Sequence, residues 1–204
     1  MTVATDFFSF LKLPGSSSSS KSSQKVSTKG KANVLKAAIK ESSRGTNNGI
    51  TASPEIKNKI SEYVKELEKI NPTKALTSDV ALDGTWTLLY TTNEGSSAGK
   101  LGPFVGTVEQ EINLTDGIYY NRVTLGPKLV RGTLSATWDV KNAKLWTVKF
   151  QDITFELFGI KVLQKSLGGT VGTWRMSYLD DNMRILYAIG GKNTVVENVY
   201  ILTK

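Results

Sequence analysis

The chain has 204 residues, enough for one domain with a sizeable core plus extensions and short for two full domains. It contains neither cysteine nor histidine, which excludes disulfides, thiolate nucleophiles, Ser-His-Asp relays and His-ligated zinc or haem. Of the formal charge of +8, residues 1–45 carry +6, from eight basic residues and two acidic ones, and residues 46–204 carry +2. A nearly neutral body weighs against nucleic-acid binding.

Residues 1–30 differ in composition from the rest of the chain. An apolar head with Phe7, Phe8 and Phe10 precedes the serine tract Ser16–Ser20, and the segment has more lysines than acidic residues. A hydroxylated, basic and acid-poor leader is typical of an organelle transit peptide. The alternative is a flexible solubilising tail, since such a segment buries too little apolar surface to fold. We favour a transit peptide or its remnant, because the apolar head is unlike a linker.

Residues 31–80 are predicted to be mainly helical. Apolar residues at a spacing of three to four predict a first helix over about residues 31–43. Ser53 and Pro54 predict the start of a second helix, with Ser as N-cap and Pro in the first turn. Pro72 is expected to end it. Both helices are expected to pack on the domain that follows.

Residues 81–204 are predicted to form a β domain, and they contain 14 of the 18 aromatic residues. Asp116-Gly117 indicates a type I′ hairpin between residues 108–114 and 118–125. Apolar and polar residues alternate over 134–140, as in a half-buried strand. About eight to ten strands without an intervening helix favour an up-and-down barrel or a sandwich. A closed barrel of about eight strands either fills its interior or holds one small ligand.

The apolar runs of the chain are short. Ile185–Ile189, among the longest, is far below the roughly 18 residues that a membrane-spanning helix needs. We therefore expect a soluble or peripherally associated protein.

Three separated motifs resemble one known family. They are Leu67-Glu68-Lys69-Ile70-Asn71-Pro72 at a helix end, Gly84-Thr85-Trp86-Thr87-Leu88-Leu89-Tyr90-Thr91-Thr92 in the first strand, and Tyr178-Leu179-Asp180-Asp181-Asn182-Met183-Arg184-Ile185 near the C-terminus. In this order the motifs resemble the plastid lipid-associated protein family, also called fibrillins, and the resemblance covers about residues 33–204. The chain departs from the family pattern after Ile185, where Leu186-Tyr187-Ala188-Ile189 replaces Ser-Arg-Gly.

The resemblance implies a mainly β fold, a lipocalin-like antiparallel barrel of about eight to ten strands with two N-terminal helices. The expected domains are a disordered basic Ser-rich leader (1–30), a helical preamble packing on the barrel (31–80) and the barrel itself (81–204). The implied location is the plastid (chloroplast), peripherally at plastoglobules or thylakoids. The implied function is to bind or coat hydrophobic metabolites, such as prenylquinones and carotenoids, without catalysis. Expected partners are a hydrophobic small molecule or lipid, a peripheral membrane or lipid-droplet surface, and a plastid protein, but no nucleic acid.

We expect no catalytic residue, no cofactor and no metal ligand. The ligand-binding candidates are seven aromatic residues of the predicted strands and one loop: Trp86, Tyr90, Phe104, Trp138, Trp146, Phe150 and Tyr178. The motif residues expected to act structurally are Asn71, Pro72, Gly84, Asp180, Asp181 and Arg184. For Trp86, a core position that closes one end of the barrel is favoured over a direct ligand contact.

The two adjacent aspartates are predicted to form a turn. Neighbouring residues of an extended chain point to opposite faces, so Asp180 and Asp181 do not readily share a proton or an ion. Asp-Asp-Asn is also favourable turn chemistry. An ion pair from one of these carboxylates to Arg184 would close the hairpin.

Two further functions stay open. The first is a scaffold barrel that recruits a lipid-biosynthetic enzyme to a plastid membrane, which requires a filled interior and an apolar outer patch. The second is an enzyme acting on a hydrophobic substrate through an inward-facing residue with a shifted pKa. Its candidate residues are Glu109, Glu111, Arg122 and Glu156.

Overall fold

The computed structural model describes residues 27–127, 129–190 and 196–204. The leader prediction falls mostly on residues 1–26, which lie outside the described residues. The helical elements are α1 (Thr28–Ser43), α2 (Pro54–Glu68), η2 (Val80–Leu82) and η3 (Ser96–Ala98). The strands are β1 (Gly84–Thr91), β2 (Lys100–Leu101), β3 (Phe104–Val105), β4 (Thr107–Asn113), β5 (Ile118–Leu125), β6 (Val130–Asn142), β7 (Leu145–Leu157), β8 (Ile160–Ser166), β9 (Val171–Leu179), β10 (Met183–Gly190) and β11 (Asn198–Thr203).

Both predicted helices are present. α1 begins at Thr28, three residues before the predicted start, because the Ser27 side chain caps it by accepting a hydrogen bond from the Gly30 amide. α2 begins at the predicted Pro54, with the Ser53 hydroxyl accepting from the amide of Ile56. No helix of the described residues is long and apolar enough to cross a membrane.

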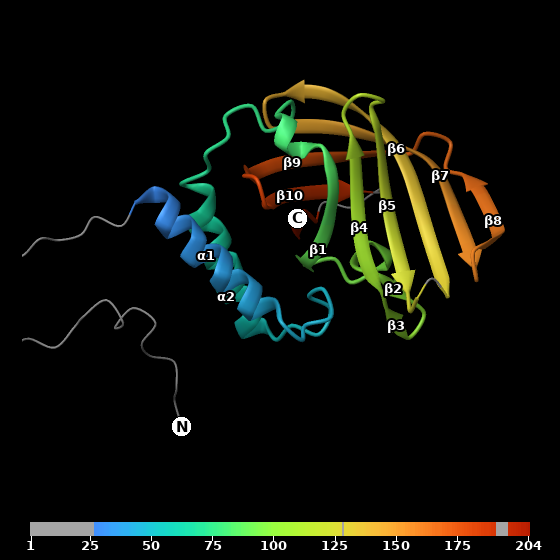
Figure 1. Cartoon of the computed structure of the whole chain (residues 1–204), viewed down its shortest axis with the longest axis horizontal. Helices are drawn as coiled ribbons and strands as arrows, with labels where there is room; N and C mark the ends of the chain where they lie inside the picture. The colour runs from blue at the N-terminus through green and yellow to red at the C-terminus, as the bar shows by residue number, and fades with distance from the viewer. Residues whose placement is uncertain (1–26, 128, 191–195) are drawn as a thin grey trace, which may run out of the picture.

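Nine strands of the described residues form one curled antiparallel sheet, and β2 and β3 pair with each other separately. The strand order is β6-β5-β4-β1-β11-β10-β9-β7-β8, and β6 also pairs with β7. Eight strands therefore make a closed ring. Figure 1 shows the curled sheet from one side. The ring is uneven, because β7 pairs with β9 only over Leu145–Lys149 and then continues beside β8. The predicted lipocalin-like barrel is confirmed.

The predicted hairpin at Asp116-Gly117 is present, but its turn is longer than expected. Asn113 faces Ile118 across β4 and β5, so the loop has four residues rather than the two of a type I′ turn. The Asn113 side chain closes this loop by accepting a hydrogen bond from the Asp116 amide at 2.9 Å and donating one to its carboxylate at 2.7 Å.

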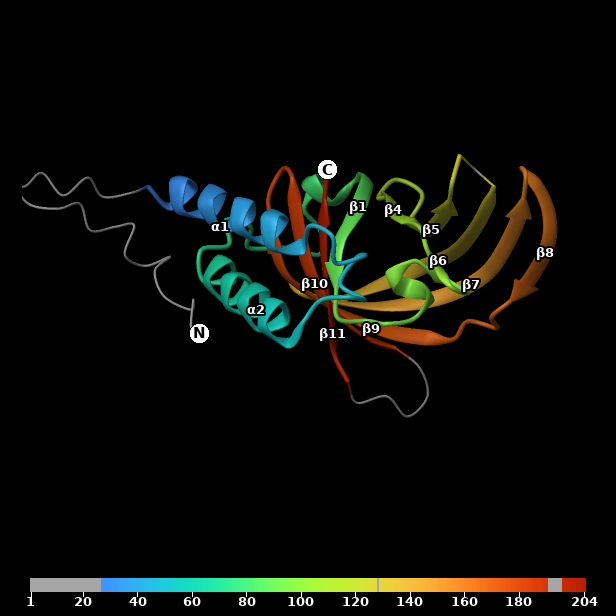
Figure 2. The same ribbon diagram turned by 90° about the horizontal axis from the view of Figure 1, so that it is seen from below.

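Two apolar cores share the sheet. The barrel core lies inside the ring and contains residues from every strand of it, such as Trp86, Val108 and Trp146. The helix core lies on the outer side of the ring, where α1 and α2 cover β1, β9, β10 and β11. Figures 1 and 2 show both helices on this one side of the barrel. The opposite side of the ring carries no helix in the described residues.

Two β-bulges change which core a side chain enters. On β1 the register with β11 shifts between Leu88 and Tyr90, so Leu88 packs in the barrel core and Tyr90 in the helix core. On β9 the register with β10 shifts in the same way, so Met176 enters the barrel core and Tyr178 the helix core. An extra residue in one strand reverses the two-residue alternation beyond it.

The motif residue Asn71 fastens the linker after α2 to the barrel. Its side-chain oxygen accepts a hydrogen bond from the Leu179 amide at 3.0 Å, and its amide nitrogen donates to the Thr73 carbonyl at 2.6 Å. The Thr73 hydroxyl then donates to the Leu179 carbonyl at 2.8 Å. The end of β9 is thus held by side chains that precede the first strand.

We predict that Asn71→Ala lowers the free energy of unfolding by about 1–3 kcal/mol, because it leaves the part-buried Leu179 amide without its acceptor. Urea unfolding followed by tryptophan fluorescence measures this change. Asn58→Ala, on the exposed face of α2, is the matched control and is expected to shift stability by less than about 0.7 kcal/mol. Equal effects of the two substitutions would contradict the role assigned to Asn71.

Candidate ligand cavity

A cavity of about 400 Å³ opens to solvent at one end of the barrel, which we call its open end. This volume lies in the range of small-molecule sites. Seven of the eight ring strands, all except β1, contribute residues to its wall, and the segments after β1 and β8 contribute its edge. The lining residues are Asn93, Ser97, Gln110, Tyr119, Asn121, Leu134, Phe150, Ile153, Leu167, Trp174, Leu186, Ala188, Ile189, Asn198 and Tyr200.

Aromatic rings pack side by side inside the barrel, next to the cavity. Trp138 stacks on Trp146 with ring centroids 4.5 Å apart, and Trp146 lies 6.4 Å from Trp174. Tyr119 meets Trp174 edge-on at 4.8 Å. The Trp146 indole donates to the Thr77 carbonyl at 3.1 Å, so its polar atom is satisfied. Trp174 and Tyr119 line the cavity, while the other two rings fill the space beside it.

A charged residue is buried inside the same ring. Arg184 has no exposed surface, its guanidinium lies 5.3 Å from the centroid of Trp86, and its Nη2 donates to Gln110. Burial lowers the pKa of Arg184 to about 10, so the side chain remains protonated at neutral pH. On the same ring of Trp86, Lys204 places its ammonium 4.5 Å from the centroid.

The cavity wall itself is apolar and aromatic with a few uncharged polar groups. No acidic or basic residue is among its lining residues. Gln110 and Asn121 are buried and face inward from β4 and β5, and the Asn121 Oδ1 has no hydrogen-bond partner in the described residues. Burial also raises the pKa of the Tyr119 phenol, which stays protonated.

The seven predicted ligand residues do not form one site. Only Phe150 lines the cavity, whereas Trp86, Trp138 and Trp146 belong to the packing of the barrel core. Tyr90 and Tyr178 point to the helix core because of the two bulges. Phe104 is 64% exposed on the β2–β3 hairpin.

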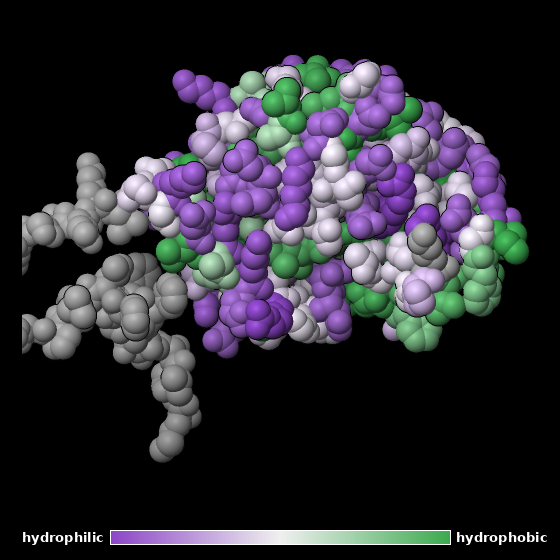
Figure 3. Space-filling view, in the orientation of Figure 1, coloured by the Kyte–Doolittle hydropathy of each residue, from purple (hydrophilic) through white to green (hydrophobic). Residues whose placement is uncertain are grey.

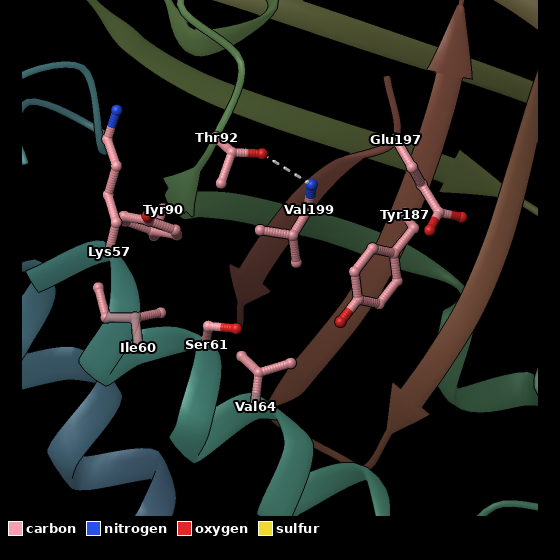
Figure 4. Close-up of a pocket in the computed structure, with 9 residues that line it drawn as sticks. All are labelled: Lys57, Ile60, Ser61, Val64, Tyr90, Thr92, Tyr187, Glu197 and Val199. Atoms are coloured by element: carbon pink, nitrogen blue, oxygen red, sulfur yellow. Dashed lines mark hydrogen bonds between the residues drawn. The ribbon is translucent and has the colours of Figure 1, made fainter. Parts of the chain in front are cut away.

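Tyr90 lines a separate, smaller hollow of about 160 Å³ between α2 and the sheet. Figure 4 shows Ile60, Ser61 and Val64 of α2 on one side, with Tyr187 and Val199 from the strands facing them. The Tyr90 hydroxyl is buried without a partner among the described residues. The hollow lies outside the ring and shares no lining residue with the barrel cavity.

Tyr178 and Asp180 border a third hollow of about 700 Å³, beside the first turns of α1. Here the Lys36 ammonium donates to Asp180 at 2.6 Å and to Asn182 at 2.9 Å, and the Tyr178 hydroxyl donates to Asp180 at 2.6 Å. The expected ion pair from this turn to Arg184 is therefore wrong. The turn itself is as predicted, because Asp180 Oδ1 accepts from the amides of Asn182 and Met183.

The remaining motif residues are structural in position. Gly84 has a φ of +99°, a left-handed conformation that favours glycine at the start of β1. Pro72 borders the hollow beside α1, and Asp181 is exposed in the turn.

The open end of the barrel has an exposed apolar rim. It combines the tips of the β2–β3, β5–β6 and β7–β8 hairpins with the outer strand β8. We define this rim by its exposed large apolar residues: Phe104, Leu129, Leu157, Phe158, Ile160, Val162 and Leu163. Figure 3 shows hydrophobic surface along the corresponding lower right edge of the molecule.

The residues considered for catalysis do not converge on the cavity. Glu111 and Arg122 form a cross-strand ion pair, and with Glu109 they alternate with the inward residues of β4 and β5. Glu156 is likewise absent from the cavity wall. Within the described residues, no three acidic side chains are grouped as a metal site requires.

These features define a lipocalin-like barrel with an apolar internal cavity, and the comparison with known proteins agrees. The family described as PAP_fibrillin matches residues 33–197, which include most of α1, all of α2 and every barrel strand except the last, β11. The chain belongs to this family.

Individual relatives are more distant. A protein of Arabidopsis thaliana named probable plastid-lipid-associated protein 5, chloroplastic, is 28% identical over 155 residues, covering 74% of this chain and 63% of that protein. The light-induced protein, chloroplastic, of Solanum demissum is 33% identical over 128 residues, covering 58% of this chain and 39% of that protein. The chain thus spans less than two thirds of the length of these relatives.

We predict that Asp180 makes part of the stability pH-dependent. Burial opposes ionisation of this carboxyl, but hydrogen bonds from Lys36, Tyr178 and the Asn182 amide outweigh it and hold its pKa below the ordinary 3.8. The stabilisation is therefore present above pH 3.8 and is lost as the pH falls through the lowered pKa of the folded state.

The measurement is the free energy of unfolding by urea at a series of acidic pH values. Asp180→Asn is expected to flatten the acid slope, whereas Asp181→Asn, in the exposed part of the same turn, is expected to keep it. An unchanged slope in Asp180→Asn would refute the assignment.

Proposed function

We propose that this protein is a plastid lipid-associated barrel that holds one hydrophobic metabolite in its cavity and performs no covalent chemistry. The observation that carries the proposal is the cavity of about 400 Å³, walled by apolar and aromatic side chains and free of charged residues in its lining. Such a wall favours apolar ligands, because each Å² of apolar surface removed from water contributes about 25 cal/mol. Prenylquinones and carotenoids are ligands of suitable chemistry.

Location in the plastid is part of the same proposal. It is supported by the relatives, which are named chloroplastic, and by the basic, serine-rich composition of residues 1–30. Within the plastid we propose a peripheral position at the surface of plastoglobules or thylakoids, with residues 1–30 acting as a transit peptide or its remnant.

The apolar rim supports contact with a lipid surface. Phe158 and Ile160 are 75% and 69% exposed at the β7–β8 turn, which follows the part of β7 that lines the cavity with Ile153. Lys161 and Lys165 are exposed on the adjoining strand β8 and complement an anionic lipid surface. A barrel that contacts lipid through its open end exchanges an apolar ligand without passing it through water.

The scaffold alternative depends on the same rim. Exposed apolar side chains also fit a protein partner, such as a lipid-biosynthetic enzyme. The cavity favours the lipid-holding function, since a scaffold requires no hollow interior.

We predict that Ala188→Phe weakens binding of an apolar ligand about tenfold or more. Ala188 lines the cavity, and a phenyl ring there occupies space that the ligand requires. Loss of roughly 55 Å² of buried apolar ligand surface at 25 cal/mol per Å² corresponds to one factor of ten.

Titration with the neutral fluorescent probe N-phenyl-1-naphthylamine, followed by displacement with a plastid lipid extract, measures this affinity. Ala37→Phe, on the exposed face of α1, is the matched control and is expected to leave it unchanged. Folded protein that binds no probe would refute the cavity function and favour the scaffold.

We predict that Phe158→Asn with Ile160→Thr reduces binding to lipid vesicles at least about tenfold, because two large apolar side chains leave the rim. Asn is compatible with the φ of +50° at position 158, and Thr suits a strand, so the fold is preserved.

Co-sedimentation with vesicles of phosphatidylglycerol and monogalactosyl diacylglycerol provides the measurement. The control is Val34→Thr with Val80→Thr, which removes exposed apolar side chains of α1 and η2, away from the rim. If both double variants bind vesicles like the unmodified protein, the rim does not contact lipid.

A further inference from the structure

The buried cation of the barrel lacks an anionic partner. Arg184 takes part in no ion pair among the described residues, and its Nε and Nη1 atoms are buried without hydrogen-bond partners there. The other strongly buried cation, Lys36, contrasts with it, because Lys36 is paired with Asp180. Buried charges in proteins are paired as a rule, since an isolated charge loses its hydration without compensation.

The contacts that Arg184 does make compensate only part of this loss. One hydrogen bond joins Nη2 to Gln110, and the face of Trp86 lies at 5.3 Å. Both partners are uncharged. Tyr119, also buried in the barrel, keeps its proton because its pKa is raised by burial. The interior of the ring therefore has a positive charge that no described carboxylate neutralises.

Arg184 lies directly behind the wall of the cavity. Leu186, two residues later on β10 and on the same face, lines the cavity, and so does Gln110. The Gln110 side-chain oxygen accepts a hydrogen bond from Arg184, so the guanidinium orients the Gln110 amide. The Gln110 Nε2 donates to no acceptor among the described residues. Asn121 adds a second amide to the wall. Rotation of this side-chain amide by 180° would present its nitrogen to a ligand oxygen.

We propose that the cavity selects lipids with a terminal carboxylate, such as long-chain fatty acids, which place the carboxylate against the amides of Gln110 and Asn121 with the Arg184 guanidinium behind Gln110. This inference rests on the proposed function of the cavity. The carboxylate oxygens accept the amide hydrogens, and its charge balances that of Arg184 across a region of low dielectric constant. The alkyl chain then follows the apolar wall past Phe150 to the rim.

The test compares two ligands of equal chain length on the unmodified full chain. Dodecanoic acid and dodecan-1-ol are titrated against bound N-phenyl-1-naphthylamine at pH 8, where the acid is ionised and Arg184 is charged. We expect the acid to displace the probe at least tenfold more effectively than the alcohol. Equal displacement, or preference for the alcohol, would overturn the carboxylate inference while leaving the cavity function intact. If the probe itself does not bind, the cavity function fails as well.

A substitution of Arg184 tests whether this residue causes the preference for the carboxylate. Arg184→Met is expected to reduce the preference for dodecanoic acid to less than threefold while the probe still binds, and Arg175→Met is the control. Arg175 pairs with Glu197 away from the cavity and is expected to keep the full preference. Since Arg184 is buried, Gln110→Leu is examined in parallel, with the same loss of preference expected if Arg184→Met does not fold. Retention of the full preference in the folded variants would overturn the role of Arg184.

Discussion

The pairing of β6 with β7 is the constraint on which the rest of the molecule depends. It joins the two halves of the sheet, so that inward side chains from eight strands share one interior. Every other feature follows from this closure: the aromatic packing around Trp146, the burial of Arg184 and the hollow that remains at the open end. The outer side of the same ring gives α1 and α2 a surface on which to bury their apolar stripes.

Much of this fold could be predicted from periodicity and local chemistry. The caps at Ser53-Pro54 and the loop at Asp116-Gly117 are encoded within a few residues, so sequence alone locates the second helix and the first hairpin. Periodicity could not predict that Tyr90 and Tyr178 face the outside of the barrel rather than its interior. A bulge is a property of two paired strands, and the register of a partner far along the chain does not show in either strand by itself.

The cavity residues illustrate the same limit. Large aromatic residues attract attention in a sequence, yet three of the four tryptophans serve to pack the barrel rather than line its cavity. The informative signal for the cavity was a polar residue at a strand position where the alternation predicts an inward, apolar one. Gln110 lies between Val108 and Ile112, and Asn121 between Tyr119 and Val123, each at an inward position of its strand. Most buried side-chain amides in proteins are hydrogen-bonded, and Gln110 is bonded in this way by accepting from Arg184.

The exposed edge strand β8 affects whether the protein associates with itself when no lipid is present. Among the described residues it pairs with β7 alone, so one of its edges has no neighbouring strand there, and all seven of its residues are exposed. An edge strand with Val162 and Leu163 exposed is a template for pairing with the same strand of another molecule. Lys161 and Lys165 flank these residues and oppose such pairing by charge repulsion. The same strand is thus kept from self-association in water by its lysines, and high salt, which screens them, promotes aggregation.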